Sequence, residues 1–344
     1  MKSAENFITL GIESSCDDTS IAVLRGEREV LSMAKKSQVD LHRDFGGVVP
    51  EIAARGHTDS IFGVLETALR DADIELQDLD LIAATCGPGL VGSLLVGITL
   101  GKALALRTHK PFVAVHHLEA HLSANFLEYE DLQFPMIGLL ISGGHSCLYH
   151  LVQPGQYEIL GETRDDAVGE LYDKVARELG LSQPGGPAVD RLVQSSDADP
   201  VKFTPPLLHS EDFDFSFSGL KTACLRAIAA KNPRDGIAKG MQNAVIEVLV
   251  AKTLRALETK GCKTLVVAGG VSANRGLRDA FAKECEIRQV RFARPSIPLC
   301  TDNGAMVARS GYDRYKWGYR SSLEVDAFSR MPLQTLLEGG LWES

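Results

Sequence analysis

The chain contains 344 residues, of which 44% are hydrophobic and 24% are charged, and it carries a formal net charge of −9. Its length predicts about two domains, and its acidity argues against stand-alone nucleic-acid binding unless a local basic patch or a partner supplies positive charge. Aromatic residues are few, at 6%, whereas glycine occurs 32 times. This balance favours an α/β enzyme with glycine loops over a base-stacking surface.

The cysteines and the apolar runs predict where the protein is found. Seven cysteines are scattered along the chain, and no two of them form a Cys-x-x-Cys pair. An odd number of separated cysteines is typical of reduced thiols in a cytoplasmic protein. Residues 1–6 lack the apolar core of a signal peptide, and the nearest apolar run, at residues 90–100, is short and glycine-broken. We therefore expect a soluble, cytoplasmic protein.

The first part of the chain predicts strands and helices in an α/β order. A Ser- and Asp-rich turn at residues 14–19 separates the first two strands, which form a hairpin. Pro50 suits the start of the first long helix. The expected strands are at residues 7–13, 20–24, 29–38, 79–85 and 112–115, and the expected helices at 50–71 and 91–107.

After Pro135 the pattern restarts with a strand, a small polar loop and a second strand. No residue-level repeat accompanies this similarity, but the shared order predicts two domains of related topology with a break near residues 128–135. The expected strands are at 136–142, 146–152 and 264–268, and the expected helices at 165–180, 187–195, 218–231, 237–260, 274–283 and 303–317.

A histidine-rich segment follows the expected strand at residues 112–115. If it is helical, His117 and His121 share one face and form a pair of potential metal ligands, whereas His116 lies off that face. Zinc proteases place a glutamate directly after the first histidine, but Glu119 stands two positions after His117 and projects from another side. Protease hydrolysis is therefore not expected. The alternative is a helix start with exposed histidines.

Three loops follow apolar strands, at residues 14–19, 142–145 and 269–272. Small residues at such positions can present backbone N–H groups to an anion. The third loop opens a helix near Asn274, which favours phosphate or ribose contacts. Each loop taken alone is most often an ordinary turn, but three in one chain, each after an apolar strand, favour contacts with a nucleotide.

Two further acidic residues each have a structural and a functional interpretation. The turn before Pro187 either starts a helix or lets a ligand hydroxyl approach the backbone at Gly186, with Asp190 one turn further on. Asp173 either contacts a ligand or forms a surface ion pair with Arg177.

Asp302 also has two interpretations. It is either the N-cap of the last long helix or a third ligand beside the two histidines. Two imidazoles and one carboxylate on one side of an ion suit iron or zinc. Sequence alone does not place Asp302 near His117.

These motifs together resemble those of the bacterial TsaD family of tRNA threonylcarbamoyladenosine transferases, an older name for which describes a glycoprotein endopeptidase. The similarity extends from about residue 8 to 318. It implies an α/β, actin-like and sugar-kinase-like (ASKHA) ATPase fold with two lobes of related topology around a nucleotide cleft. The motifs stand in family order at residues 11–20, 116–121, 140–145, 166–174, 184–187, 215–221, 269–274 and 301–304.

The resemblance also implies an activity and a set of site residues. One divalent metal, usually taken as iron, with zinc as the other candidate, would be held by His117, His121 and Asp302. The threonylcarbamoyl group of threonylcarbamoyl-AMP would pass to N6 of adenosine 37 in tRNAs that read codons beginning with A, releasing AMP. No residue is assigned as a general base. The substrate contacts carried over are Leu140, Ile141, Ser142, Gly143, Gly144, Asp173, Gly186, Asp190 and Asn274.

The expected lobes are residues 1–132 with about 303–325, and residues 133–302, followed by an irregular tail at 326–344. The implied partners are tRNA, a smaller paralogue (TsaB) and an ATPase subunit (TsaE). A small-molecule kinase of the same fold and a non-catalytic scaffold of a tRNA-modifying complex are the alternatives. Two clusters form either basic patches or solvated faces: Lys35, Lys36, His42 and Arg43, and Arg309, Arg314, Lys316 and Arg320.

Overall fold

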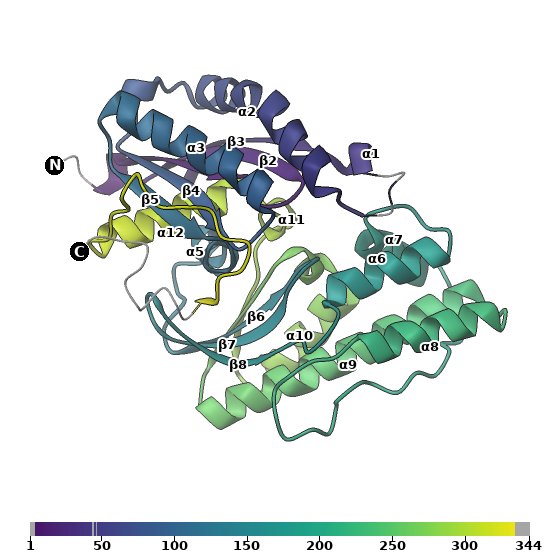
Figure 1. Cartoon of the computed structure of the whole chain (residues 1–344). Helices are drawn as coiled ribbons and strands as arrows, with labels where there is room; N and C mark the ends of the chain where they lie inside the picture. The colour runs from purple at the N-terminus through teal and green to yellow at the C-terminus, as the bar shows by residue number, and fades with distance from the viewer. Residues whose placement is uncertain (1–3, 43–44, 46, 334–344) are drawn as a thin grey trace. The chain divides into compact units, whose positions relative to one another are not determined.

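The computed structural model describes residues 4–42, 45 and 47–333, which fall into two compact units. Unit 1 comprises Met1–Asp131 and Thr301–Ser344, and unit 2 comprises Leu132–Cys300 (Figure 1). The sequence placed Asp302 at the end of the second lobe, whereas it belongs to unit 1. The reason is that α12 (Gly304–Lys316), which begins two residues later, packs on the sheet of unit 1. Most of the expected tail, from residue 334, lies outside the described residues.

Unit 1 is built on a mixed sheet with the strand order β3-β2-β1-β4-β5. β2 is antiparallel to both β1 and β3, while β4 runs parallel to β1 and to β5. Its strands are β1 (Ile8–Glu13), β2 (Asp18–Arg25), β3 (Glu29–Ser37), β4 (Leu81–Gly87) and β5 (Phe112–His116). Its other helices are α1 (Val39–His42), α2 (Pro50–Ala72), α3 (Val91–Thr108), α4 (His117–Ser123) and α5 (Asn125–Glu128), with 3-10 turns at Ala4–Asn6 and Leu76–Asp78.

Glycines let helices approach both faces of this sheet closely. A Cβ on Gly11 of β1 would lie 2.2 Å from the main-chain oxygen of Gly304, where α12 begins. On the other face, a Cβ on Gly97 of α3 would lie 2.3 Å from the hydroxyl oxygen of Ser14. Figure 1 shows α12 and α3 on opposite sides of the sheet. The first contact holds the start of α12 against β1, and the second holds α3 against the loop that follows β1.

Unit 2 repeats the same topology with the strand order β10-β9-β6-β7-β8. β7 is antiparallel to β6 and β8, while β9 runs parallel to β6 and β10. This correspondence confirms the expected α/β fold with two lobes of related topology. The strands are β6 (Met136–Ile141), β7 (Ser146–Gln153), β8 (Gln156–Glu162), β9 (Thr264–Ala268) and β10 (Arg291–Ala293). The helices are α6 (Val168–Glu178), α7 (Gly185–Gln194), α8 (Ser218–Ala229), α9 (Arg234–Lys260), α10 (Arg275–Ile287) and α11 (Ile297–Cys300), with a 3-10 turn at Gly270–Ala273.

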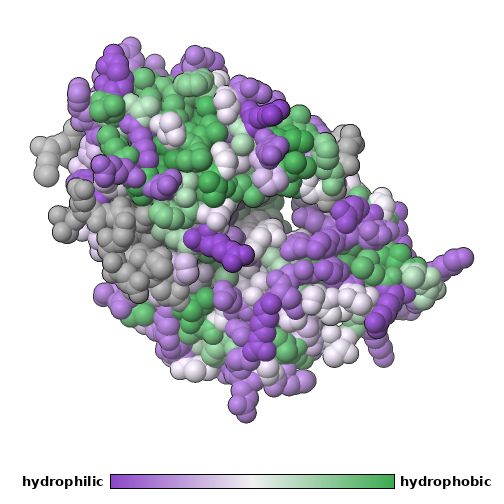
Figure 2. All heavy atoms as spheres, viewed as in Figure 1, coloured by the Kyte–Doolittle hydropathy of each residue, from purple (hydrophilic) through white to green (hydrophobic). Residues whose placement is uncertain are grey.

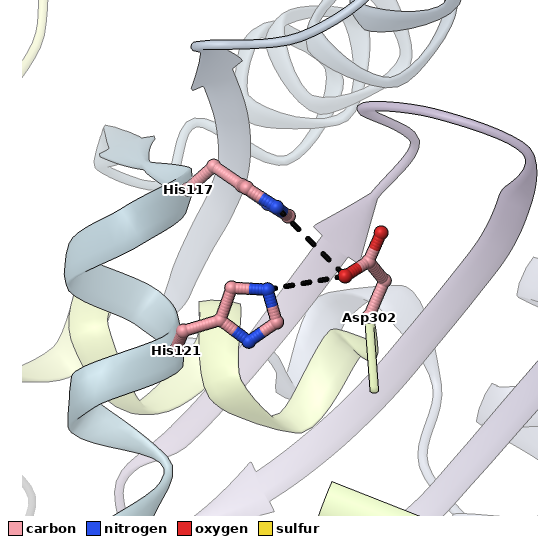
Figure 3. Close-up of side chains that lie close together, drawn as sticks. All are labelled: His117, His121 and Asp302. Atoms are coloured by element: carbon pink, nitrogen blue, oxygen red, sulfur yellow. Dashed lines mark ion pairs between the residues drawn. The ribbon is translucent and has the colours of Figure 1, made fainter. Parts of the chain in front are cut away.

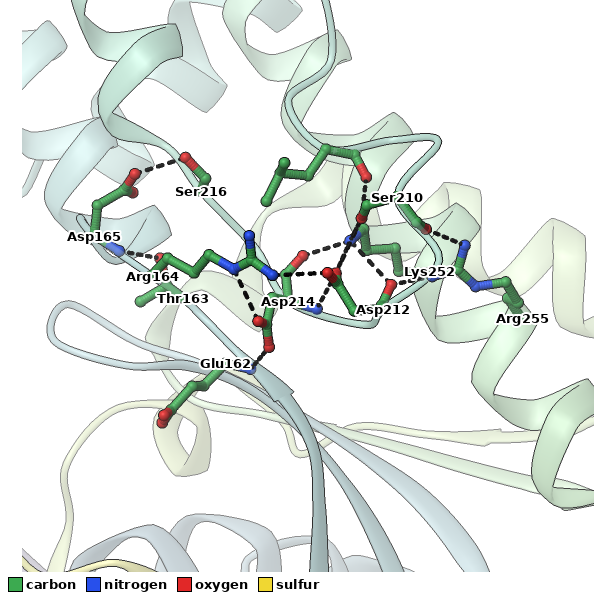
Figure 4. Close-up of polar contacts among 11 residues, drawn as sticks. Glu162, Thr163, Arg164, Asp165, Ser210, Asp212, Asp214, Ser216, Lys252 and Arg255 are labelled. Atoms are coloured by element: carbon green, nitrogen blue, oxygen red, sulfur yellow. Dashed lines mark hydrogen bonds and ion pairs between the residues drawn. The ribbon is translucent and has the colours of Figure 1, made fainter.

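A buried lysine anchors the long loop that precedes α8 in unit 2. The Nζ of Lys252, on α9, donates to the hydroxyl of Ser210 at 2.8 Å and to the main-chain oxygen of Asp212 at 3.3 Å (Figure 4). Arg164 pairs with Asp212 at 2.7 Å and with Asp214 at 2.9 Å. Because the ammonium binds several oxygens of one loop, its burial is compensated and the loop is held against α9.

Helix α3 begins at the predicted residue but is more apolar than the sequence analysis expected. It continues to Thr108 and is long and apolar enough to cross a membrane by length and composition, a test that core helices of soluble proteins also pass. Figure 2 shows apolar side chains gathered over α2 and α3. Phe62, Val91, Leu95 and Leu106 are exposed there. All seven cysteines lie within the described residues and have free thiols.

Candidate metal centre and substrate surface

The two histidines share one face of α4, as the sequence predicted. The helix begins where β5 ends, because the Nδ1 of His116 accepts a hydrogen bond from the backbone N–H of Leu118 at 3.2 Å and caps the helix. The rings of His117 and His121 lie 4.6 Å apart between centroids at an interplanar angle of 75°. Both side chains are buried, at 6% and 1% exposure, so the alternative of an exposed helix start is wrong.

Asp302 lies beside the histidine pair (Figure 3). Its Oδ1 is 3.1 Å from the Nε2 of His121 and 3.8 Å from the Nε2 of His117. One ligand atom from each of the three residues lies within 4.8 Å of the other two. The N-cap of α12 is Asn303, whose Oδ1 accepts from the backbone N–H of Met306 at 2.9 Å, so the N-cap interpretation of Asp302 is wrong.

His121 supplies a test of whether this cluster fits a metal ion. Its Nδ1 has no hydrogen-bond partner among the residues that the structure describes, and its Nε2 faces only the Asp302 carboxylate, although the side chain is almost fully buried. A buried polar atom without a partner is costly, and a cation bound to the imidazole would remove that cost. Two imidazole nitrogens and a carboxylate form a donor set suited to zinc or iron. The geometry therefore fits a divalent metal site.

Glu13, which the sequence analysis did not single out, orients His117. The Nδ1 of His117 lies 3.2 Å from Glu13 Oε2 and 3.2 Å from the hydroxyl of Ser15. Thr85 donates its hydroxyl to Glu13 Oε2 at 2.6 Å, and the backbone N–H of Ser15 donates to Oε1 at 2.6 Å. A carboxylate on the far nitrogen of a ligating histidine fixes its ring and its tautomer. The one signal in the sequence was a charged residue at the end of an otherwise apolar strand.

The carboxylates set the charge of this cluster. Burial by itself lowers the pKa of His117, but the neighbouring Glu13 and Asp302 outweigh it and raise that pKa to about 9. Burial raises the pKa of Glu13, yet the charge of His117 lowers it overall. The pKa of Asp302 is also lowered, because the histidines outweigh its burial. Anionic carboxylates around a buried imidazole favour a cation at this position.

Glu119 has a structural role away from the histidines. Its Oε1 and Oε2 accept from Arg314 of α12 at 2.6 and 3.0 Å, and both side chains are buried. Arg309 is also buried and pairs with Asp313 at 2.9 Å. The expected basic cluster on this helix is therefore wrong for Arg309 and Arg314, since both serve internal contacts. As the sequence predicted, Glu119 does not face the metal ligands.

In unit 2, the predicted substrate loop at residues 142–145 packs against the start of α6. The backbone N–H of Gly169 donates to the main-chain oxygen of Ser142 at 3.2 Å. A Cβ on Gly169 would lie 2.5 Å from that oxygen, so this close approach requires glycine. Gly143 and Gly144 are exposed, and no described atom lies within 4 Å of where their Cβ atoms would be. Their backbone is accessible to a ligand.

Asp173 connects α6 to the start of α7. Its Oδ1 accepts from the backbone N–H of Gly185 at 2.7 Å. A Cβ on Gly185 would lie 2.5 Å from the main-chain oxygen of Tyr172, whereas Gly186 has no described atom within 4 Å of its Cβ position. The helix therefore begins at Gly185, two residues before the predicted start, and Gly186 stays open beside Asp173.

Asp190 and Asn274 meet at the start of α10. The Oδ2 of Asp190 lies 3.3 Å from the backbone nitrogen of Arg275, which donates to it, and its Oδ1 is buried with no hydrogen-bond partner among the described residues. Asn274 caps α10 by accepting from the backbone N–H of Leu277 at 2.9 Å. Its Nδ2 donates to Gln242 at 2.8 Å. These contacts bring predicted substrate residues from α7 and α10 together within unit 2.

Comparisons with known proteins agree with this arrangement. A family model described as "TsaD: tRNA N6-adenosine threonylcarbamoyltransferase" matches residues 29–309. A Clostridium botulinum protein named tRNA N6-adenosine threonylcarbamoyltransferase is 44% identical over 335 residues, which cover 96% of this chain and 98% of the relative. A Staphylococcus aureus protein of the same name is 43% identical over 336 residues, which cover 96% and 98%.

Solved structures support the fold alone. The HypF of T. kodakarensis matches with a TM-score of 0.63 and 15% identity, covering 91% of this chain and 48% of that one. Component A of the (R)-2-hydroxyglutaryl-CoA dehydratase of Acidaminococcus fermentans matches with a TM-score of 0.56 and 16% identity, covering 90% and 100%. The fold is of the actin-like and sugar-kinase-like (ASKHA) class.

Proposed function

Because the chain belongs to the family of tRNA N6-adenosine threonylcarbamoyltransferases, we propose that it transfers the threonylcarbamoyl group of threonylcarbamoyl-AMP to N6 of adenosine 37 in tRNA. The acceptor tRNAs read codons beginning with A, and AMP is released. The observation that carries the proposal is the cluster of His117, His121 and Asp302, in which two buried imidazoles meet a partly buried carboxylate.

The resident ion that we propose is Fe²⁺, with Zn²⁺ as the alternative. His117, His121 and Asp302 would hold it, and Glu13 would keep the ring of His117 turned toward it through Nδ1. When bound, a divalent ion supplies a Lewis acid that stabilises negative charge on oxygen. Zinc and iron both accept this donor set, so metal analysis of protein purified without added metal distinguishes them.

The chain's own residues bind and orient the donor in this proposal. The backbone after Leu140 and Ile141, at Ser142, Gly143 and Gly144, would hold the threonylcarbamoyl end through N–H groups. Asp173 and Asp190 would accept from ribose hydroxyls, beside the open backbone of Gly186. Asn274 would contact the adenosine end.

The reaction forms a bond from N6 of the adenine to the carbonyl carbon and breaks the bond from that carbon to the phosphate oxygen. The amine loses a proton, and AMP leaves as the anion. Since AMP is already an activated leaving group, positioning of the two reactants contributes most to the rate. The acceptor adenine must leave its stack to reach the donor.

Mass analysis of tRNA nucleosides tests the activity. Incubation with threonylcarbamoyl-AMP, tRNA and the partner proteins should produce threonylcarbamoyladenosine at position 37, and a tRNA lacking adenosine at that position should give none. ATP turnover that depends on a small molecule and not on tRNA would favour the kinase alternative. Undiminished product in a reaction without this chain would favour the scaffold alternative.

We further propose that the protein is cytoplasmic and works with a smaller paralogue (TsaB) and an ATPase subunit (TsaE). The exposed apolar face formed by Phe62, Val91, Leu95 and Leu106 is the docking surface that we propose for the paralogue. Apolar patches of this kind mark protein–protein or membrane contacts. The half of α3 that faces the sheet carries Gly97 and Gly101, whereas Val91, Leu95 and Leu106 are exposed on the helix.

Leu95→Glu should weaken binding of the paralogue by about 10-fold or more, because a charge would be buried in the interface. Leu95 is 43% exposed in the free chain, so the substitution should leave folding intact. Leu225→Glu, on α8 and 37% exposed, is the matched control and should bind normally. Titration calorimetry with purified partner is the measurement. Equal affinity of Leu95→Glu and the unsubstituted chain would contradict this docking surface.

A further inference from the structure

Lys35, on β3, contacts the segment that carries the third metal ligand. Its Nζ donates to the main-chain oxygen of Asp302 at 2.9 Å and to the hydroxyl of Thr301 at 3.2 Å. The same ammonium pairs with Asp18 Oδ2 at 2.6 Å. An ammonium has three N–H donors, so these three oxygens match its full capacity. Lys35 is exposed, as the solvated-face interpretation predicted, but its ammonium also has these three partners.

Asp302 needs such support more than the histidines do. His117 and His121 are fixed by a helix that continues directly from β5, whereas Asp302 lies two residues after Cys300, where the chain leaves unit 2. Thr301 and Asp302 belong to neither a helix nor a strand. Beyond them the chain is held by Ser20 of β2, whose hydroxyl accepts from the backbone N–H of Gly304 at 3.0 Å.

The hydrogen bond from Lys35 leaves the carboxylate oxygens of Asp302 available to a metal ion. The ammonium binds the main-chain oxygen of Asp302, while Oδ1 of the same residue faces the Nε2 atoms of both histidines. Asp18 fixes the ammonium from the other side, and the Lys35 and Asp18 side chains are only 28% and 17% exposed. Lys35 therefore constrains where the backbone of Asp302 lies without competing for its carboxylate.

We propose that Lys35 is a positioning residue of the metal site. It clamps Thr301 and Asp302 to β3, so that the Asp302 carboxylate stays with the histidines of unit 1 instead of following the segment that enters from unit 2. The inference rests on the proposed metal site. It assigns to Lys35 of β3 the role of holding the backbone that carries the third ligand, Asp302.

Affinity for Zn²⁺ tests the clamp without any activity measurement. Lys35→Met keeps the aliphatic stem and removes the charge, and it should weaken Zn²⁺ binding about 10-fold or more in competition with a chromophoric chelator, since groups behind metal ligands typically contribute 10- to 100-fold. Lys36→Met is the matched control. Lys36 is the next residue on β3, is exposed, and has no side-chain hydrogen bond or ion pair among the described residues.

The melting temperature of the metal-free protein separates a local from a general effect. It should fall by less than about 4 °C in Lys35→Met, because a partly exposed ion pair contributes little to stability. Lys35→Arg keeps a cation and should lose less affinity than Lys35→Met. A much lower metal-free melting temperature in Lys35→Met, or equal loss in the arginine variant, would contradict positioning by the charge.

The outcomes also separate the clamp from the metal site. If the unsubstituted chain binds Zn²⁺ and Lys35→Met binds it with the same dissociation constant, the positioning role of Lys35 is refuted and the proposed metal site is supported. If the unsubstituted chain binds no divalent metal at all, the proposed metal site is refuted, and the positioning role of Lys35 is refuted with it. A loss shared equally by Lys36→Met would show that the charge of the strand, and not the contact, is responsible.

Discussion

His117→Ala is expected to abolish metal binding and threonylcarbamoyl transfer together. The substitution removes one of three groups whose ligand atoms lie within 4.8 Å of one another. Substitutions behind a metal ligand already cost about 10- to 100-fold in affinity, so loss of a ligand should cost more than about 100-fold. Metal content after dialysis and mass analysis of the tRNA nucleosides are the two measurements.

Two further variants control this experiment. His117→Ala also removes one partner of the buried Glu13 carboxylate, which by itself lowers stability. Asp302→Asn changes a ligand without exposing Glu13 and should lose metal and transfer as well. His150→Ala removes a partly buried histidine of β7 in unit 2, which pairs with Glu158, and should change neither. Full transfer by a metal-free His117→Ala protein would refute the metal assignment.

The features that the sequence predicted best are those set by local spacing. His117 and His121 are four residues apart, so a single helix is enough to align them, and the Cβ directions of that helix also turn Glu119 away. The three loops were likewise visible because each follows an apolar strand that became β1, β6 or β9. Even the related topology of the two units followed from the repeated order of strand, loop and strand.

The features that it missed depend on contacts between distant segments. Lys35 reaches Asp302 across 267 positions, and Glu13 reaches His117 across 104. No local pattern distinguishes such a lysine from one on a solvated face. β8 and β10 were missed for a related reason. Both are edge strands with exposed positions, so their apolar pattern is weak.

The pair of Glu119 and Arg314 shows how distance in sequence hides a stabilising contact. The two side chains are separated by 195 positions, are 2% and 1% exposed, and join α4 to α12 through two hydrogen bonds of 3.0 and 2.6 Å. Arg314 also lies 5.4 Å from the Trp317 ring. This pair therefore stabilises the packing of α4 against α12 in unit 1.

Glu119→Ala is therefore expected to destabilise unit 1 strongly. Removing one partner of a buried ion pair costs about 3–5 kcal/mol, which corresponds to a melting temperature lower by roughly 6–20 °C. Thermal unfolding followed by circular dichroism is the measurement. Glu29→Ala, which breaks the exposed pair of Glu29 with Arg25, should change stability by less than about 1 kcal/mol.

The same variant distinguishes a structural glutamate from a hydrolytic base. If Glu119 is structural, Glu119→Ala should bind Zn²⁺ with nearly normal affinity below its melting transition, and Glu119→Ala with Arg314→Met should regain part of the lost stability, because no unpaired charge stays buried. If Glu119 were instead a general base, Glu119→Ala should unfold at the normal temperature but have a much lower rate of catalysis. Unchanged thermal unfolding of Glu119→Ala would contradict the structural role, whereas a lower melting temperature with metal affinity retained would exclude a protease-like part for this residue.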